Sequence, residues 1–143
     1  MIKKLLVISF IIALGAWAST AAAGPGHGAD TQCYVWANNA TSNIGAAYNP
    51  SSPYSFNTNG DAATKNMVTR TATGTYTVNC KGVGGGGWGA PGGHVQVTAY
   101  GNTNSACKVQ NWGTGGADFT ASVKCYGSTG AAVNSQFDLL FVW

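Results

Sequence analysis

Apolar and polar residues alternate in short runs along most of the chain after Cys33. The alternation is clearest in HVQVTAY (residues 94–100), DFTASVKCY (118–126) and FDLLFV (137–142). A period of two places successive side chains on opposite faces of a β-strand, so each run predicts a strand with one face toward a core. The side chains expected to point inward are Val95, Val97, Phe119, Ala121, Val123, Phe137, Leu139 and Phe141.

The runs are short and separated by Gly, Asn, Ser and Pro. They predict strands near 33–38, 44–48, 54–57, 67–71, 75–80, 94–100, 107–112, 119–126 and 136–142. This spacing is typical of a sandwich or jelly roll. No Pro/Ser linker or charge run divides the chain. We therefore predict one all-β domain over 32–143, an antiparallel β-sandwich of jelly-roll-like form.

Threonine occupies every second position from 69 to 77 in the segment VTRTATGTYTVNC. A three-residue loop Ala-Thr-Gly, with glycine at the positive φ position, predicts a hairpin that pairs Thr69 with Thr77 and Thr71 with Thr75. Such pairs stabilise a solvated sheet face by about 0.2–1 kcal/mol each, so an ordinary outer face explains the pattern. A hydroxyl array for a polysaccharide or ice surface is the alternative. Arg70 lies in phase with the apolar set, which indicates a sheet margin or a shifted register.

The N-terminus has the three parts of a secretory signal peptide. Lys3 and Lys4 precede an apolar run from Leu5 to about Trp17, and small residues follow up to Ala23. The run is shorter than the roughly 20 residues that span a bilayer, so we expect cleavage rather than anchoring. We predict a signal peptide at 1–23, a flexible tail at 24–31, secretion to the extracellular space or periplasm, and no transmembrane helix.

The four cysteines, Cys33, Cys80, Cys107 and Cys125, follow this signal, which favours two disulfides. Folding 107–125 as a hairpin places Cys107 opposite Cys125, Val109 opposite Val123, Asn111 opposite Ala121 and Lys108 opposite Lys124. Pairing Cys107 with Cys125 leaves Cys33 with Cys80 by elimination, at the cost of opposed lysines. No Cys-x-x-Cys pair is present, so we predict no metal site.

Charge is sparse after residue 23, with five basic residues against four aspartates and no glutamate. Nucleic acid is therefore not an expected partner. The glycine-rich segment KGVGGGGWGAPGGH (81–94) lacks the phosphate-loop spacing. Trp88 within it either folds onto the core or stands exposed for stacking on a sugar or partner. Trp112 and Tyr126 are weaker candidates for the same surface, and Trp36 is expected in the core or at its margin.

Catalysis has little support in the sequence. The histidines are His27 and His94, and neither a Gly-x-Ser-x-Gly nor a His-Glu-x-x-His motif occurs. The aspartates offering a glycosidase pair are Asp30, Asp61, Asp118 and Asp138. Cleavage before His27 would create an amino-terminal copper site with His94, resembling the histidine brace of polysaccharide monooxygenases. We predict no enzyme activity and no cofactor, with a small secreted enzyme as an alternative.

Several motifs together carry a family resemblance. The segments TGTYTVNCKGVGG (73–85), HVQVTAYG (94–101), CKVQNW (107–112), SVKCYG (122–127) and FDLLFVW (137–143) resemble secreted bacterial β-sandwich modules of no settled activity. The resemblance covers roughly 33–143 and implies the fold, Cys107 and Cys125, but no active site. The last segment also resembles the final strand of outer-membrane barrels, although most strands here are short and carry a polar face.

The function predicted from the sequence is that of a secreted, non-catalytic binding or structural surface module. A polysaccharide or a cell-surface protein is the expected partner. The alternative is a carbohydrate-binding module that uses Trp88, Trp112 and Tyr126.

Overall fold

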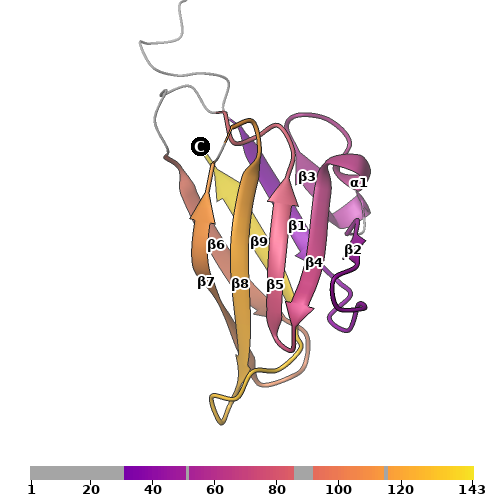
Figure 1. Ribbon diagram of the computed structural model, residues 1–143, viewed down its shortest axis with the longest axis vertical. Helices are drawn as coiled ribbons and strands as arrows, with labels where there is room; N and C mark the ends of the chain where they lie inside the picture. The colour runs from indigo at the N-terminus through magenta and orange to yellow at the C-terminus, as the bar shows by residue number, and fades with distance from the viewer. Residues whose placement is uncertain (1–30, 51, 86–91, 115) are drawn as a thin grey trace, which may run out of the picture.

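Two antiparallel sheets pack face to face (Figure 1). The computed structural model describes residues 31–50, 52–85, 92–114 and 116–143. The strands are β1 (Gln32–Ala37), β2 (Ala47–Tyr48), β3 (Phe56–Asn57), β4 (Asn66–Ala72), β5 (Thr75–Cys80), β6 (His94–Tyr100), β7 (Ser105–Gly113), β8 (Phe119–Gly127) and β9 (Gln136–Val142). A 3₁₀ turn, η1 (Ser52–Tyr54), and a short helix, α1 (Ala62–Lys65), precede β3 and β4. The predicted all-β fold is confirmed.

The first sheet has the order β3-β1-β9-β6 and the second the order β2-β4-β5-β8-β7. Strands β4 and β5 and strands β7 and β8 form hairpins within the second sheet, whereas the chain changes sheets between β5 and β6 and between β8 and β9. The first strand, β1, therefore pairs with the last strand, β9, and β3 and β6 form the two edges of this sheet. Figure 1 shows β6, β9 and β1 behind the plane of β7, β8, β5 and β4.

The core lies between the sheets and contains the side chains that the alternation predicts to point inward. Phe119, Ala121, Val123, Phe137, Leu139 and Phe141 are buried, and Val95 and Val97 pack against them half-buried. Phe119 of one sheet stacks on Phe141 of the other with ring centroids 4.1 Å apart. Each fully buried side chain of this size stabilises the fold by about 1.5–3 kcal/mol, so this layer is the main stabilising contribution.

Both predicted disulfides are present. Cys33 and Cys80 join β1 to β5 and thus link the two sheets, and Cys107 and Cys125 join the paired strands β7 and β8. Disulfides are typical of proteins of an oxidising compartment. No helix in the described parts of the chain is long and apolar enough to cross a bilayer.

Two hairpin registers differ from the sequence prediction, each by a bulge. Between β7 and β8 the ladder shifts after Val109, so that Asn111 faces Ser122 rather than Ala121. The bulge turns the end of β7 over, and Trp112 takes the place opposite Ala121.

The second shift lies between β4 and β5. Thr69 faces Thr77 as predicted, but Ala72 rather than Thr71 faces Thr75, because Thr71 is the extra residue of the bulge. Gly74 has the expected positive φ of 64°. The threonines still alternate with buried Val68, Tyr76 and Val78, which confirms that they form an outer face.

Charged residues near the strands have specific partners. Lys108 and Lys124 face each other as predicted, and each ammonium group lies 5.5 Å from the centroid of the Tyr126 ring, whose cation–π attraction offsets their repulsion. Arg70 lies at the sheet margin, where its Nε donates to the carbonyl of Ser42 at 2.6 Å. Arg70 therefore shares the alternation of the apolar residues because it lies at the margin of the sheet, and not because the strand is paired out of register.

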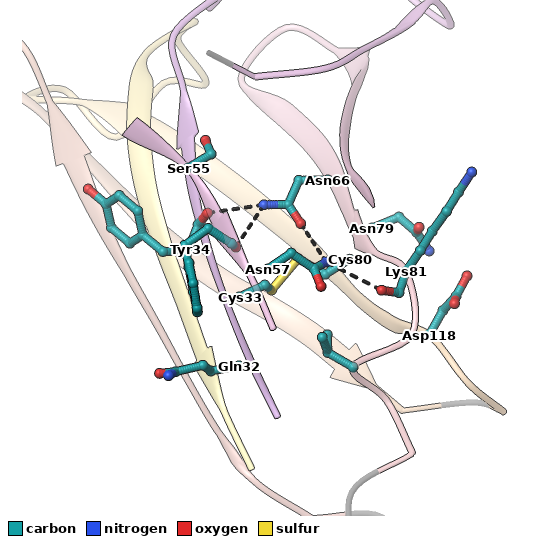
Figure 2. The surroundings of a disulfide bond; sticks show 12 residues. Gln32, Cys33, Tyr34, Ser55, Asn57, Asn66, Asn79, Cys80, Lys81 and Asp118 are labelled. Atoms are coloured by element: carbon teal, nitrogen blue, oxygen red, sulfur yellow. Dashed lines mark hydrogen bonds between the residues drawn. A yellow bond between two sulfur atoms is a disulfide. The ribbon is translucent and has the colours of Figure 1, made fainter. Parts of the chain in front are cut away.

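A buried pair of asparagines lies beside the disulfide between the sheets (Figure 2). The Nδ2 of Asn66 on β4 donates to the carbonyl of Tyr34 at 3.1 Å and to that of Phe56 at 3.0 Å. Its Oδ1 accepts a 2.9 Å hydrogen bond from the Nδ2 of Asn57 on β3. The network gives part-buried carbonyls of β1 and β3 a donor from β4, and it ties both strands to the second sheet.

The predicted N-terminal segments and the predicted strand at 44–48 compare differently with the structure. The predicted signal peptide and residues 24–30 of the predicted tail lie outside the described residues. Thr31, the last residue of that tail, accepts a hydrogen bond from the N–H of Trp143 at 2.9 Å and donates through Oγ1 to the carbonyl of Val83. The predicted strand at 44–48 is reduced to β2, because Gly45 turns the chain with a φ of 81°.

Candidate functional site

Strand β1 divides its side chains between the core and an exposed aromatic surface. Cys33, Val35 and Ala37 point inward and are buried, so Tyr34 and Trp36 point outward. Figure 2 shows the Tyr34 ring on the side of β1 away from the Cys33–Cys80 disulfide. The prediction that Trp36 lies in the core or at its margin is therefore wrong, since its ring is half-buried on the outside of the sheet.

The neighbouring strands extend this surface. Trp36 faces Asp138 on β9, and Asp138 faces Thr98 on β6. Directly opposed residues share a face of the sheet, so these side chains form a row across β1, β9 and β6. The next row joins Tyr34, Leu140 and Gln96 in the same way.

Aromatic rings and one carboxylate surround a hollow of about 250 Å³ on this surface. Its lining residues, which we call the aromatic face, are Tyr34, Trp36, Tyr54, Tyr100 and Asp138. The side chains of Tyr54 and Tyr100 are 62% and 51% exposed, so their rings are available to a ligand.

The rings of the aromatic face do not form a flat platform. Tyr54 lies 5.0 Å from Trp36 between ring centroids with an interplanar angle of 87°, and Tyr100 lies 5.7 Å from Trp36 at 79°. Edge-to-face pairs of this kind are favourable, and they place both tyrosine rings steeply against the Trp36 ring. The hollow is therefore a walled depression, which suits one ligand unit better than an extended flat surface.

Two further hollows continue the central one along β9. A hollow of about 290 Å³ shares Tyr34 and Asp138 with the central hollow and adds Gln96, Thr98 and Leu140. On the other side, a hollow of about 210 Å³ shares Tyr100 and is lined by the polar residues Asn102, Thr103, Asn134, Ser135 and Gln136, together with Ala40 and Gly101. The three hollows follow β9 from Leu140 through Asp138 to Gln136 and form an interrupted groove.

Asp138 and Tyr34 interact at the wall between two of these hollows. Burial, the hydrogen bond to the Asp138 carboxylate and its negative charge together raise the pKa of Tyr34 to about 12. The phenol therefore keeps its proton well above neutral pH. The Asp138 carboxylate therefore lines the groove with the Tyr34 hydroxyl beside it.

This arrangement can bind a ligand by ring contacts and by hydrogen bonds. Its single carboxylate does not provide the two acids that glycoside hydrolysis usually requires. In the described part of the chain, no group of three His, Cys, Asp or Glu side chains lies together as a metal ligand set. His94 is exposed at the start of β6, and His27 lies outside the described residues.

The residues singled out by the sequence do not form this site. Trp88 lies outside the described residues. Trp112 points to the inner side of its sheet and contacts Phe119 at a centroid distance of 6.3 Å, leaving 38% of its surface exposed. Tyr126 follows the buried Cys125 and points to the outer side. Trp112 and Tyr126 thus lie on opposite faces of the second sheet, and the structure does not bring them together.

Part of the aromatic face has a signal in the sequence. In QCYVWA (residues 32–37) the cysteine alternates in step with Val35 and Ala37, which indicates that these three side chains point to the core. The tyrosine and tryptophan between them must then point outward. The positions of Tyr54 and Tyr100 have no comparable signal, because they depend on how the first sheet is assembled. Comparisons with models of protein families, with curated proteins and with solved structures found no match.

Proposed function

We propose that the chain is a secreted, non-catalytic module that binds a saccharide chain along the aromatic face. The observation that carries this proposal is the row of hollows along β9, whose central member is walled by aromatic rings. The two disulfides agree with an extracellular or periplasmic location.

The chemistry of the groove fits a sugar chain in two respects. The C–H faces of a sugar ring pack on aromatic faces, which contribute large contact areas with little conformational freedom to lose. The polar groups between the rings, including Gln96, Thr98 and Asp138, can pair with hydroxyl groups that lose water on binding. Hollows in series accommodate successive units of one chain, and their walls disfavour a flat crystalline surface.

A protein partner is the second candidate for the same surface. Phe56 on β3 faces Tyr34 and is 49% exposed, and Leu140 is 36% exposed beside it. Phe56 widens the aromatic face toward the β3 edge of the first sheet, whereas Leu140 lies on the other side of Tyr34, within the groove. A partner that covers this wider area would lose affinity when Phe56 is truncated, whereas a sugar chain in the groove would not.

Calorimetric titration with a panel of soluble linear oligosaccharides tests the proposal. Tyr100→Ala and Tyr54→Ala should each weaken binding of the best oligosaccharide at least tenfold, which corresponds to about 1.4 kcal/mol. Tyr126→Ala is the matched control, because it removes an aromatic ring from the outer face of the second sheet. The proposal fails if no oligosaccharide binds, or if Tyr126→Ala weakens binding as much as Tyr100→Ala.

A further inference from the structure

The charges of the described residues are divided between the two sheets. Each lysine and arginine belongs to the strands of the second sheet or to the segments that adjoin them: Lys65, Arg70, Lys81, Lys108 and Lys124. On the outer face of the first sheet, Asp138 is the one carboxylate among the described residues. Among the described residues, the groove therefore carries negative charge, and the positive side chains belong to the other sheet and the segments that adjoin it.

Asp138 also differs from the other described aspartates in what it binds. Asp61 caps α1 by accepting from the N–H of Ala63 at 3.0 Å. Asp118 accepts a 2.9 Å hydrogen bond from the N–H of Gly82 and so holds the turn after β5. Asp138 instead interacts with the hydroxyl of Tyr34 on the surface of the groove. Two of the three carboxylates thus have structural partners, and the third faces the site.

The surroundings of Asp138 favour a cation over a neutral group. The faces of aromatic rings carry partial negative charge and attract ammonium groups, and Trp is the strongest ring in this respect. Trp36 lies directly opposite Asp138 on the neighbouring strand, and Tyr34 and Tyr100 line the same hollow. A hydroxyl would gain only a hydrogen bond to the carboxylate here, whereas an ammonium group would add the attraction between two full charges and cation–π contacts with the rings.

From this geometry we infer that the saccharide bound by the groove is an amino sugar chain, whose protonated amine lies on Asp138 between Trp36 and Tyr34. The inference rests on the proposed saccharide function and specifies its substrate class. Asp138 lines both the central hollow and the hollow toward Leu140, so its ligand group occupies the middle of the groove. That position matches a substituent on a unit within a chain, with neighbouring units in the hollows on either side.

Three hexasaccharides with the same β-1,4-linked backbone test the inference by calorimetry at mildly acidic pH. They carry a free amine (glucosamine), an acetamide (N-acetylglucosamine) or a hydroxyl (glucose) at carbon 2. The glucosamine hexamer should bind at least tenfold more tightly than the glucose hexamer, and added salt should reduce this difference. Asp138→Asn should remove the preference, so that this variant binds the glucosamine and glucose hexamers with affinities within about threefold of each other.

Asp61→Asn is the matched control for charge, because it removes one negative charge at a helix cap that asparagine fills equally well. It should leave the preference unchanged. Equal binding of the glucosamine and glucose hexamers, or a preference that survives Asp138→Asn, would overturn the inference while the saccharide function stands. Choline that binds as tightly as the glucosamine hexamer would overturn it in favour of a small cation. If no oligosaccharide binds at all, the proposed function itself is refuted.

Discussion

Replacing Asn66 with alanine should strongly destabilise the domain. Asn66 is fully buried and makes three side-chain hydrogen bonds, to the carbonyls of Tyr34 and Phe56 and from Asn57. Each such bond contributes about 0.5–1.5 kcal/mol net, and a buried group left without a partner costs about 1–3 kcal/mol. Because the substitution leaves two part-buried carbonyls without this donor and the buried amide of Asn57 without this acceptor, we expect a loss of about 3 kcal/mol in the free energy of unfolding.

Denaturant unfolding with both disulfides intact measures this loss, and the thermal midpoint should fall by about 10 °C. Asn79→Ala is the matched control on the other strand of the same hairpin. Its amide makes one exposed hydrogen bond, to Thr120 at 3.4 Å, and its loss should change stability by no more than about 0.5 kcal/mol. The reasoning is refuted if Asn66→Ala costs less than about 1 kcal/mol, or no more than Asn79→Ala.

Three further predictions concern a turn and the tyrosines. Gly74→Ala should cost at least twice as much stability as Gly130→Ala: both residues have positive φ, of 64° and 80°, but only at Gly74 would a Cβ lie 2.7 Å from backbone oxygens. Equal losses in denaturant unfolding would contradict this. Since the pKa values of Tyr34 and Tyr48 are raised to about 12, mainly by burial, the native state keeps protons that the unfolded chain loses near pH 10. Stability should therefore be full below about pH 10 and fall toward pH 12. In a spectrophotometric titration, Asp138→Asn should lower the pKa of Tyr34 only in part, because burial remains; an unchanged titration would show that the carboxylate has no influence.

The fold was largely predictable because its strands follow the alternation of side chains. Core positions such as Val123 and Leu139 repeat with period two, and the cysteines fall in the same phase. The elimination that paired Cys33 with Cys80 depended on one correctly placed hairpin. The bulges escaped prediction because an extra residue such as Thr71 leaves the composition of a strand unchanged and alters only its pairing.

The candidate site was less predictable than the fold. Tyr54 belongs to η1 and Tyr100 to the end of β6, which are 46 positions apart in the numbering and meet only around Trp36. Such a surface depends on the order of strands in a sheet, which alternation within a strand does not specify. The sequence predicted Trp88 as a site residue instead, because it is a single tryptophan within a glycine-rich segment.

The position of the inter-sheet disulfide has a mechanical consequence. Strands β1 and β9 run antiparallel with Gln32 opposite Val142, so the chain enters and leaves this pair at the same end. A force that separates these ends would load the ladder one hydrogen bond at a time, as in a zipper. Peeling of β1 would stop at its second residue, Cys33, because the bond to Cys80 holds it to the other sheet. Tyr34 and Trp36 lie beyond that stop, so β1 would keep both rings in place under tension for as long as the disulfide is oxidised.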